Sequence, residues 1–370
     1  MAQPFDATPN RSPLHNHHVK AGARLALRDG WEMPADYGSP EEECDQLYNR
    51  AAVMDLACDG RIRVRGDGAL GMLEYLCTAD VARQEDDSAI RSLLLNQAGS
   101  VIDMVTVLRL DGWWVLTCSP ARRQTVLEHL KSHTGQFDAK VDDQTLKTTT
   151  VAVIGPLAAE ILDGFLPDKP SRIAPGEVKV GSMMIARYIA ARTGATGLWS
   201  LEVTLPNMLV GQAWKFVTTK AGENAISPAG MDAREVLRIE ARLPRWGKEI
   251  NEDADPISAG LGGLVCFEKD FLGADAVKTA RQAGVSHRRV AWSMEPAGQG
   301  SRNAGIAQGD GLLDTAGTAI GTVTSAAFSH SAGIWLGQAS AKTGLLGVGS
   351  MFAIETASGD RHHATVAEVF

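Results

Sequence analysis

Residues 96–117 read NQAGSVIDMVTVLRLDGWWVLT, and this stretch predicts a β-hairpin around which the fold is organised. Val101–Leu110 is rich in β-branched residues, Asp111-Gly112 is a tight-turn dipeptide, and Trp113–Thr117 is the returning strand. Side chains alternate across a strand. The first strand is therefore predicted to place Val101, Asp103, Val105 and Val107 on one face and Ile102, Met104, Thr106 and Leu108 on the other.

Asp103 is the unusual residue of the hairpin. Both faces of its strand are apolar enough to be buried, so its carboxylate is expected among valines. A buried charge is costly unless it is paired or hydrogen-bonded. Two interpretations stay open: a ligand or substrate supplies the partner, or a backbone N–H or a buried arginine does.

Composition limits the class of protein. A chain of 370 residues has room for roughly two to three domains. The net charge of -8 argues against a nucleic-acid role that depends on a broad basic surface. No apolar run approaches the ~18 residues of a transmembrane helix, and the N-terminus lacks the basic and apolar regions of a secretory signal. A cytoplasmic protein without membrane or nucleic-acid partners is expected.

Metal and disulfide sites are not predicted. The five cysteines are scattered, and none forms a CxxC pair, which is typical of reduced cytosolic thiols. His15, His17 and His18 lie close together, but no carboxylate or cysteine cluster accompanies them. A solvated or locally bonded histidine group is favoured over a metal site.

Two helix starts carry clear signals. Ser39 suits an N-cap, Pro40 the first helical position, and a helix is expected to about Val53. Ser119-Pro120 repeats the signature and places Arg122 and Arg123 in a first turn, where the helix dipole disfavours cations. A solvated pair is favoured there over contact with an anionic ligand.

The order of elements predicts an α+β fold. Strands and helices follow one another in a mixed order without steady βαβ repeats, which argues against a doubly wound sheet. Residues 1–13 are polar and contain two prolines, so a flexible arm is expected. After a basic link at 281–289, short β-rich runs separated by Gly and Ser predict an antiparallel barrel or sandwich. No GxGxxG after a strand, GxxxxGK[ST], GxSxG or HExxH motif is present.

Several motifs, in order along the chain, resemble one known family. They are Gly30-Trp31-Glu32-Met33-Pro34 with Tyr37-Gly38, Asn96 followed by Gly99-Ser100-Val101-Ile102-Asp103, Gly155-Pro156, Arg192-Thr193-Gly194, Thr196-Gly197, residues 233–244 (AREVLRIEARLP), Ala259-Gly260-Leu261-Gly262, Asp270-Phe271-Leu272-Gly273, and Gly321-Thr322-Val323-Thr324-Ser325 with Ser329. The chain is similar to the aminomethyltransferase, or T-protein, of the glycine cleavage system and its folate-dependent relatives.

This resemblance implies a ring of three modules around a central tetrahydrofolate site. Residues 14–280 would form the folate-binding region of two α/β modules, and residues 281–370 the C-terminal antiparallel β-barrel. By resemblance, Asp103 faces the folate and helps to deprotonate and orient the nitrogen that receives the one-carbon unit. Arg234 and Glu202 would contact the folate, and Trp31 the substrate. The implied partners are a small-molecule one-carbon donor and, optionally, a lipoyl carrier protein.

Several positions depart from the family pattern. In the pterin-binding motif Ala195 replaces Tyr and Leu198 replaces Glu, while Cys118 replaces an Asn that contacts the pterin. Trp246 and Arg91 each stand where the family has Tyr, Asp59 stands for Met, and Met104 for the second Asp of the hairpin. Cys118, Leu198 and Trp246 are therefore predicted folate positions, with Arg91 and Asp59 as candidate substrate contacts. Arg91 could hold a carboxylate and Trp246 could cover a cation or ring, although an ion pair or core packing is favoured for each alone.

Three functions are consistent with this pattern. The first is a tetrahydrofolate-dependent transferase of aminomethyl or methyl groups with an altered pocket. The second is a glycine-cleavage aminomethyltransferase that tolerates the changes. The third is a non-catalytic folate-binding or scaffold protein. The iron–sulfur version of that third class is disfavoured because residues 265–269 (VCFEK) lack its Lys-Gly-Cys-Tyr signature.

Overall fold

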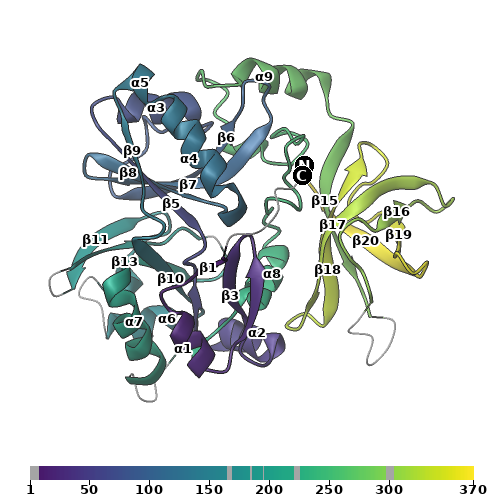
Figure 1. The fold of residues 1–370 in the computed structure, drawn as a ribbon. Coiled ribbons are helices and arrows are strands. Elements are labelled where there is room, and N and C mark those ends of the chain that lie inside the picture. Colours follow the sequence, from purple (N-terminus) through teal and green to yellow (C-terminus); the bar gives the residue numbers. More distant parts are fainter. Residues whose placement is uncertain (1–7, 165–168, 184–185, 195, 221–225, 297–303) are drawn as a thin grey trace.

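The computed structural model describes residues 8–164, 169–183, 186–194, 196–220, 226–296 and 304–370. In this part of the chain, strands form three sheets and one closed barrel (Figure 1). Two of the sheets lie on one side of the molecule and the barrel lies on the other, with helix α8 (Met231–Glu240) between them (Figure 1). The predicted α+β class and the C-terminal antiparallel barrel are confirmed.

The hairpin lies in a five-stranded sheet, as its sequence predicts. The strand order is β6 (Ser88–Leu95), β7 (Val101–Leu110), β8 (Trp113–Cys118), β5 (Gly60–Arg65) and β9 (Lys140–Asp143). Gly112 turns the chain between β7 and β8 with a φ of 74°, a conformation that glycine adopts without strain. Helices α3 (Ala69–Leu76), α4 (Arg123–Ser132) and α5 (Thr134–Phe137) cover one face, and that core contains Leu73, Val105 and Val107.

A β-bulge changes the predicted faces of β7. Leu94 pairs with Asp103 but Leu95 pairs with Val101, so Ile102 is the extra residue. Ile102 consequently packs in the same core as Val105, while Val101 packs with Leu93 and Leu95 on another side. The simple alternation that grouped Val101 with Asp103 is therefore wrong at the start of the strand, and it holds from Asp103 onward.

The second large sheet has six strands with helices on both faces. Its order is β11 (Val178–Met183), β12 (Ala186–Ala191), β13 (Ser200–Pro206), β10 (Thr148–Ile154), β4 (Ala52–Asp55) and β14 (Ser227–Pro228). Helices α6 (Ala158–Asp163) and α7 (Asn207–Lys215) supply one core. Helices α2 (Pro40–Asn49) and α8 pack on the opposite face against Met54, Ala152 and Ile154.

Helix α2 starts as predicted but ends earlier. The Ser39 hydroxyl accepts a hydrogen bond from the Glu42 N–H, and Pro40 occupies the first turn. The helix ends at Asn49, not near Val53, because Val53 belongs to β4. All four residues of that strand are buried between β10 and β14. After Ser119, the chain forms a 3₁₀ turn (Pro120–Arg122) before α4 starts.

The N-terminal segment forms a small sheet of order β1 (Asn10–Arg11), β3 (Trp31–Asp36) and β2 (Arg24–Arg28), with α1 (His15–Lys20) between β1 and β2. Strand β1 pairs in parallel with Trp31 and Glu32. Residues 10–11 of the expected flexible arm are therefore ordered by strand pairing, and residues 1–7 lie outside the described residues. Among the described residues, no helix is long and apolar enough to cross a membrane.

The C-terminal barrel closes in the order β15 (His287–Met294), β18 (Ile334–Lys342), β17 (Ala319–Ser329), β16 (Gly311–Leu313), β19 (Met351–Glu355) and β20 (Arg361–Val369). It has its own core around Trp292, Phe352 and Ile354. Helix α9 (Ala274–Ala283) precedes it, and α8 contacts β17 and β18. Short 3₁₀ segments (Pro170–Arg172 and Gly262–Leu264) and a π-turn (Phe216–Lys220) complete the regular structure.

Candidate functional site

A cavity of about 250 Å³ lies where the two large sheets meet helix α8. The five-stranded sheet contributes Arg91, Met104, Thr106, Thr117 and Cys118 to its wall; the six-stranded sheet contributes Met54, Thr150, Ala152, Ile154, Ser200 and Glu202; and α8 contributes Met231, Arg234, Glu235 and Arg238. The β2–β3 turn, residues 56–61 and residues 243–246 close the remaining sides. None of the described barrel residues lines it.

Asp103 lies behind the cavity wall. Its side chain is fully buried, and it is not among the lining residues. One carboxylate oxygen accepts a hydrogen bond from the Ser119 N–H and the other accepts one from the Ser119 hydroxyl, each at 2.7 Å. Met104, the next residue along β7, faces the cavity in its place. Ser119 also lines the cavity, so it connects the buried carboxylate to the cavity space.

Burial raises the pKa of Asp103 to about 6, against the effect of hydrogen bonds from Ser119 and of the Arg122 charge. The carboxyl therefore changes its charge just below neutral pH. When Asp103 is ionised, it accepts a hydrogen bond from the Ser119 hydroxyl. The lone pairs of the Ser119 oxygen then stay available to a donor on a ligand. When Asp103 is protonated, it can donate to Ser119 instead. Its charge thus sets whether Ser119 accepts or donates toward the cavity.

Asp59 and Arg234 form an ion pair on the cavity wall. The Asp59 oxygens accept hydrogen bonds from Arg234 Nη1 at 3.1 Å and Nη2 at 2.7 Å, which is the bidentate geometry of a strong pair. Burial alone would lower the pKa of Arg234, but the charge and hydrogen bond of Asp59, together with nearby Cys58 and Glu202, raise it above its usual range. Asp59 therefore holds its loop against α8 through Arg234.

Arg61 holds the loop that carries Asp59. Its side chain is buried at 2% exposure. Its guanidinium donates to backbone oxygens of Leu56, Ala57, Asp59, Thr145 and Thr148. Buried polar groups that are fully hydrogen-bonded make a segment rigid. The position of Asp59 is therefore set by the protein before any ligand arrives.

Glu202 and Ser200 share the cavity face of β13. The Glu202 carboxylate accepts a 2.7 Å hydrogen bond from the Thr193 hydroxyl, and burial raises its pKa. The Ser200 hydroxyl is buried and has no hydrogen-bond partner among the described residues. A buried hydroxyl without a partner is unfavourable, so this atom is available to a ligand. Together these groups suit a ligand with ring N–H and amino groups.

Trp246 lines the cavity and covers a cation that belongs to the protein. The Arg122 guanidinium lies 4.0 Å from the centre of its ring. Arg122 also donates to the Ile102 carbonyl at 3.0 Å and pairs with Glu252. Arg123 pairs with Asp143. The solvated arginine pair favoured from the sequence is therefore wrong, because both side chains are largely buried and pair with groups of the protein.

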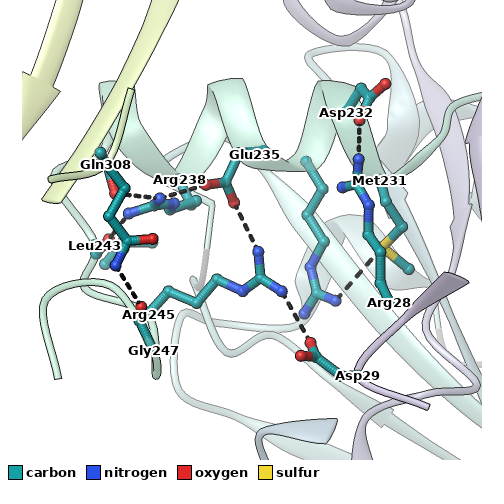
Figure 2. Close-up of polar contacts among 12 residues, drawn as sticks. Arg28, Asp29, Met231, Asp232, Glu235, Arg238, Leu243, Arg245, Gly247 and Gln308 are labelled. Carbon is teal, nitrogen blue, oxygen red and sulfur yellow. Dashed lines mark hydrogen bonds and ion pairs between the residues drawn. The ribbon is translucent and has the colours of Figure 1, made fainter. Parts of the chain in front are cut away.

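A network of ion pairs crosses the rim of the cavity (Figure 2). Arg245 pairs with Asp29 of the β2–β3 turn at 2.8 Å and with Glu235 of α8 at 3.4 Å. Arg238 pairs with Glu235 and with buried Glu249, and donates to Ser325 of the barrel. The network connects the turn, α8 and the barrel, so it holds these parts around the cavity.

Six of the nine predicted site residues are brought together at the cavity: Asp59, Arg91, Cys118, Glu202, Arg234 and Trp246. Leu198 packs against the apolar cluster of α2, α8 and the six-stranded sheet. Trp31 is buried with Met33, Ala57 and Cys58. Neither is a lining residue, and each packs among apolar neighbours, some of which line the cavity themselves. Asp103 reaches the cavity only through Ser119.

Sequence reasoning missed several lining residues. Ser119 and Ser200 carry no signal beyond a helix-start pattern and a strand. Glu235 and Arg238 stand in the quoted motif of residues 233–244 but were not singled out. Thr106 and Thr117 could have been found as neighbours across the hairpin. Among the described residues, no group of three His, Cys, Asp or Glu side chains is placed to hold a metal ion.

Comparisons with known proteins agree with this architecture. The family model of the GCVT N-terminal domain matches residues 14–269, and that of the glycine cleavage T-protein C-terminal barrel domain matches residues 293–369. An aminomethyltransferase of Desulfitobacterium hafniense (strain Y51) is 31% identical over 321 residues, 86% of each chain. One of Rubrobacter xylanophilus is 30% identical over 326 residues, 85% of this chain and 86% of the relative.

A solved structure extends the likeness to three dimensions. The glycine cleavage system aminomethyltransferase T from Bartonella henselae superposes with a TM-score of 0.88 and 27% identity, covering 97% of both chains. The curated relatives are named as enzymes, which does not favour the non-catalytic interpretation. Both family models, the relatives and the three-part architecture lead to one assignment: the chain belongs to the glycine cleavage T-protein family.

Proposed function

We propose that this protein transfers a one-carbon unit, methyl or aminomethyl, to tetrahydrofolate in the cavity between its two large sheets. The cavity walls carry this proposal: Glu202, Ser200 and the Asp59–Arg234 pair offer polar groups on one side. The reduced folate, when bound, supplies a nucleophilic ring nitrogen that receives the carbon. A pterin ring presents N–H and amino groups, and these suit the Glu202 carboxylate and the unpartnered Ser200 oxygen.

Asp103 and Ser119 are proposed to manage the proton at the reacting nitrogen. Ionised Asp103 holds the Ser119 hydroxyl as an acceptor toward the cavity. A pKa of about 6 keeps most of Asp103 ionised at neutral pH and still basic enough to stabilise a proton nearby. Asp103 therefore acts through Ser119 as a positioning residue, and Ser119 is the group expected to touch the ligand.

The remaining cavity residues are proposed to shape the donor side. Cys118 stays a neutral thiol, because burial raises its pKa well above the usual range. Trp246 and Met104 close the wall next to it. Relatives work on aminomethyl groups, as their names say. The proposed donor carries either an aminomethyl or a methyl group. A lipoyl carrier protein is a proposed partner only for the aminomethyl donor.

Calorimetric titration with tetrahydrofolate tests the proposal. The wild-type protein is expected to bind, and Glu202→Leu to bind at least roughly ten-fold more weakly, because a charge-assisted hydrogen bond is lost. Glu128→Gln, on the exposed side of α4, is the matched control and is expected to bind like wild type. No heat of binding at ~1 mM folate would refute the proposal.

A further inference from the structure

Three polar side chains form a row across the five-stranded sheet. Arg91 of β6 pairs with Thr106 of β7, and Thr106 pairs with Thr117 of β8. Residues paired in neighbouring strands present their side chains on the same face at close spacing. All three line the cavity. The row therefore places one guanidinium and two hydroxyls side by side on a single wall.

Among the described arginines that line the cavity, Arg91 stands out because it is neither paired with a carboxylate nor saturated by backbone oxygens. Arg28, Arg234, Arg238 and Arg245 each pair with a carboxylate, and Arg61 is saturated by backbone oxygens. Arg91 makes one 3.2 Å hydrogen bond, to the Gly194 carbonyl. Within the described ranges, it forms no ion pair, and neither Thr106 nor Thr117 has a side-chain hydrogen bond.

The wall around Arg91 favours an anion. Burial lowers the pKa of the Arg91 guanidinium, since the charge is partly removed from water, while the negative charge of Glu202 acts in the opposite direction. A partly desolvated cation gains most from a ligand that brings the opposite charge. A guanidinium presents parallel N–H donors that match the two oxygens of a carboxylate, and threonine hydroxyls add further donors.

We propose that the row of Arg91, Thr106 and Thr117 binds the carboxylate of the one-carbon donor, so that the donor is a small free acid. This assignment rests on the proposed function and names its substrate class. The assignment argues against a donor that is a protonated aminomethyl amine on a carrier protein, because Arg91 would repel that cation. The same chemistry has a second source, the glutamyl carboxylates of folate, and the experiment separates the two.

Acetate serves as a minimal probe of carboxylate binding, and acetamide is its uncharged counterpart of similar size. Ligand-observed NMR titrations use the wild-type protein with and without saturating tetrahydrofolate. Acetate is expected to bind in both conditions, and acetamide to bind roughly ten- to hundred-fold more weakly. Arg91→Met is expected to reduce acetate binding to the acetamide level, and Arg91→Lys to restore part of it. Arg63→Met, outside the cavity and paired with Asp142, is the control.

Folate titrations distinguish the sources of the carboxylate. Tetrahydropteroate lacks the glutamyl group of tetrahydrofolate. If Arg91 binds the donor, Arg91→Met should leave the affinities of the protein for both compounds unchanged. If the variant weakens tetrahydrofolate alone, Arg91 holds the folate tail, and the donor assignment is overturned. Acetate binding that is equal in wild type and Arg91→Met, with the thermal midpoint preserved, also overturns it. Acetate binding without any folate binding would leave the anion site standing and reject the proposed function instead.

Discussion

Replacing Asp103 with asparagine should remove a pH dependence from the stability of the fold. In the wild type the pKa of this carboxyl rises from 3.8 to about 6 on folding. Between these values the unfolded chain loses the proton while the folded chain keeps it, so stability falls as pH rises. Above pH 6 Asp103 is ionised in both the folded and the unfolded protein, and stability falls no further. A shift of about two pKa units corresponds to roughly 3 kcal/mol.

Asparagine keeps an acceptor for the Ser119 N–H but cannot ionise. The free energy of unfolding of the variant, compared with that of the wild type at the same pH, is therefore expected to be roughly 3 kcal/mol more favourable at pH 7 than at pH 4. Urea unfolding at several pH values measures the difference in the free energy of unfolding. Asp111→Asn in the exposed hairpin turn is the matched control, and should show no such trend. A difference between wild type and Asp103→Asn that is the same at pH 4 and pH 7 would refute the reasoning.

Three further perturbations follow from the contacts described. Arg61→Met should lower the free energy of unfolding by roughly 3–5 kcal/mol, because several buried carbonyl oxygens lose their donor; a normal denaturation curve would contradict this. Leu198→Glu should lower the free energy of unfolding by roughly 1–3 kcal/mol, because a carboxylate would enter an apolar cluster; an unfolding curve identical to that of the wild type would contradict this. Arg238→Met leaves buried Glu249 without its ion pair and should cost roughly 3–5 kcal/mol in urea unfolding, with Arg242→Met, of an exposed pair, as the control.

Local signals predicted much of the fold. The hairpin turn at Asp111-Gly112 and the cap at Ser39 depend on nearby residues, and these appear as expected. The end of α2 was misplaced because the pairing of Val53 with β10 is a long-range contact. The polar residues at the start of strand β20, Arg361–His363, obscure its alternation in the sequence. Its place in the sheet comes from barrel closure.

The site was less accessible to sequence reasoning. Alternation groups residues into faces but does not say which face meets a cavity, and it left open whether a ligand or a backbone N–H is the partner of Asp103. Only the family resemblance implied that Asp103 faces the ligand, and in the structure the Ser119 N–H is one of its partners. The structure gives that position to Met104 and places Asp103 on the core side. Leu198 and Trp31 were assigned by motif position alone, and their apolar side chains pack in cores. The chemical departures at Arg91 and Asp59 were visible because they change residue type at the cavity itself.

On β7 the cavity wall is made of the alternate residues Met104 and Thr106, and Val105 and Val107 beside them build the core under α3 and α4. Thr106, and Thr117 paired with it on β8, can therefore be exchanged during evolution without removing a side chain from that core. The bulge at Ile102 and the rigid loop under Arg61 stay unchanged by such exchanges. A lineage that needs a new one-carbon donor can reach it by a few substitutions on one side of two strands. The scaffold thus separates the choice of substrate from the conditions for folding.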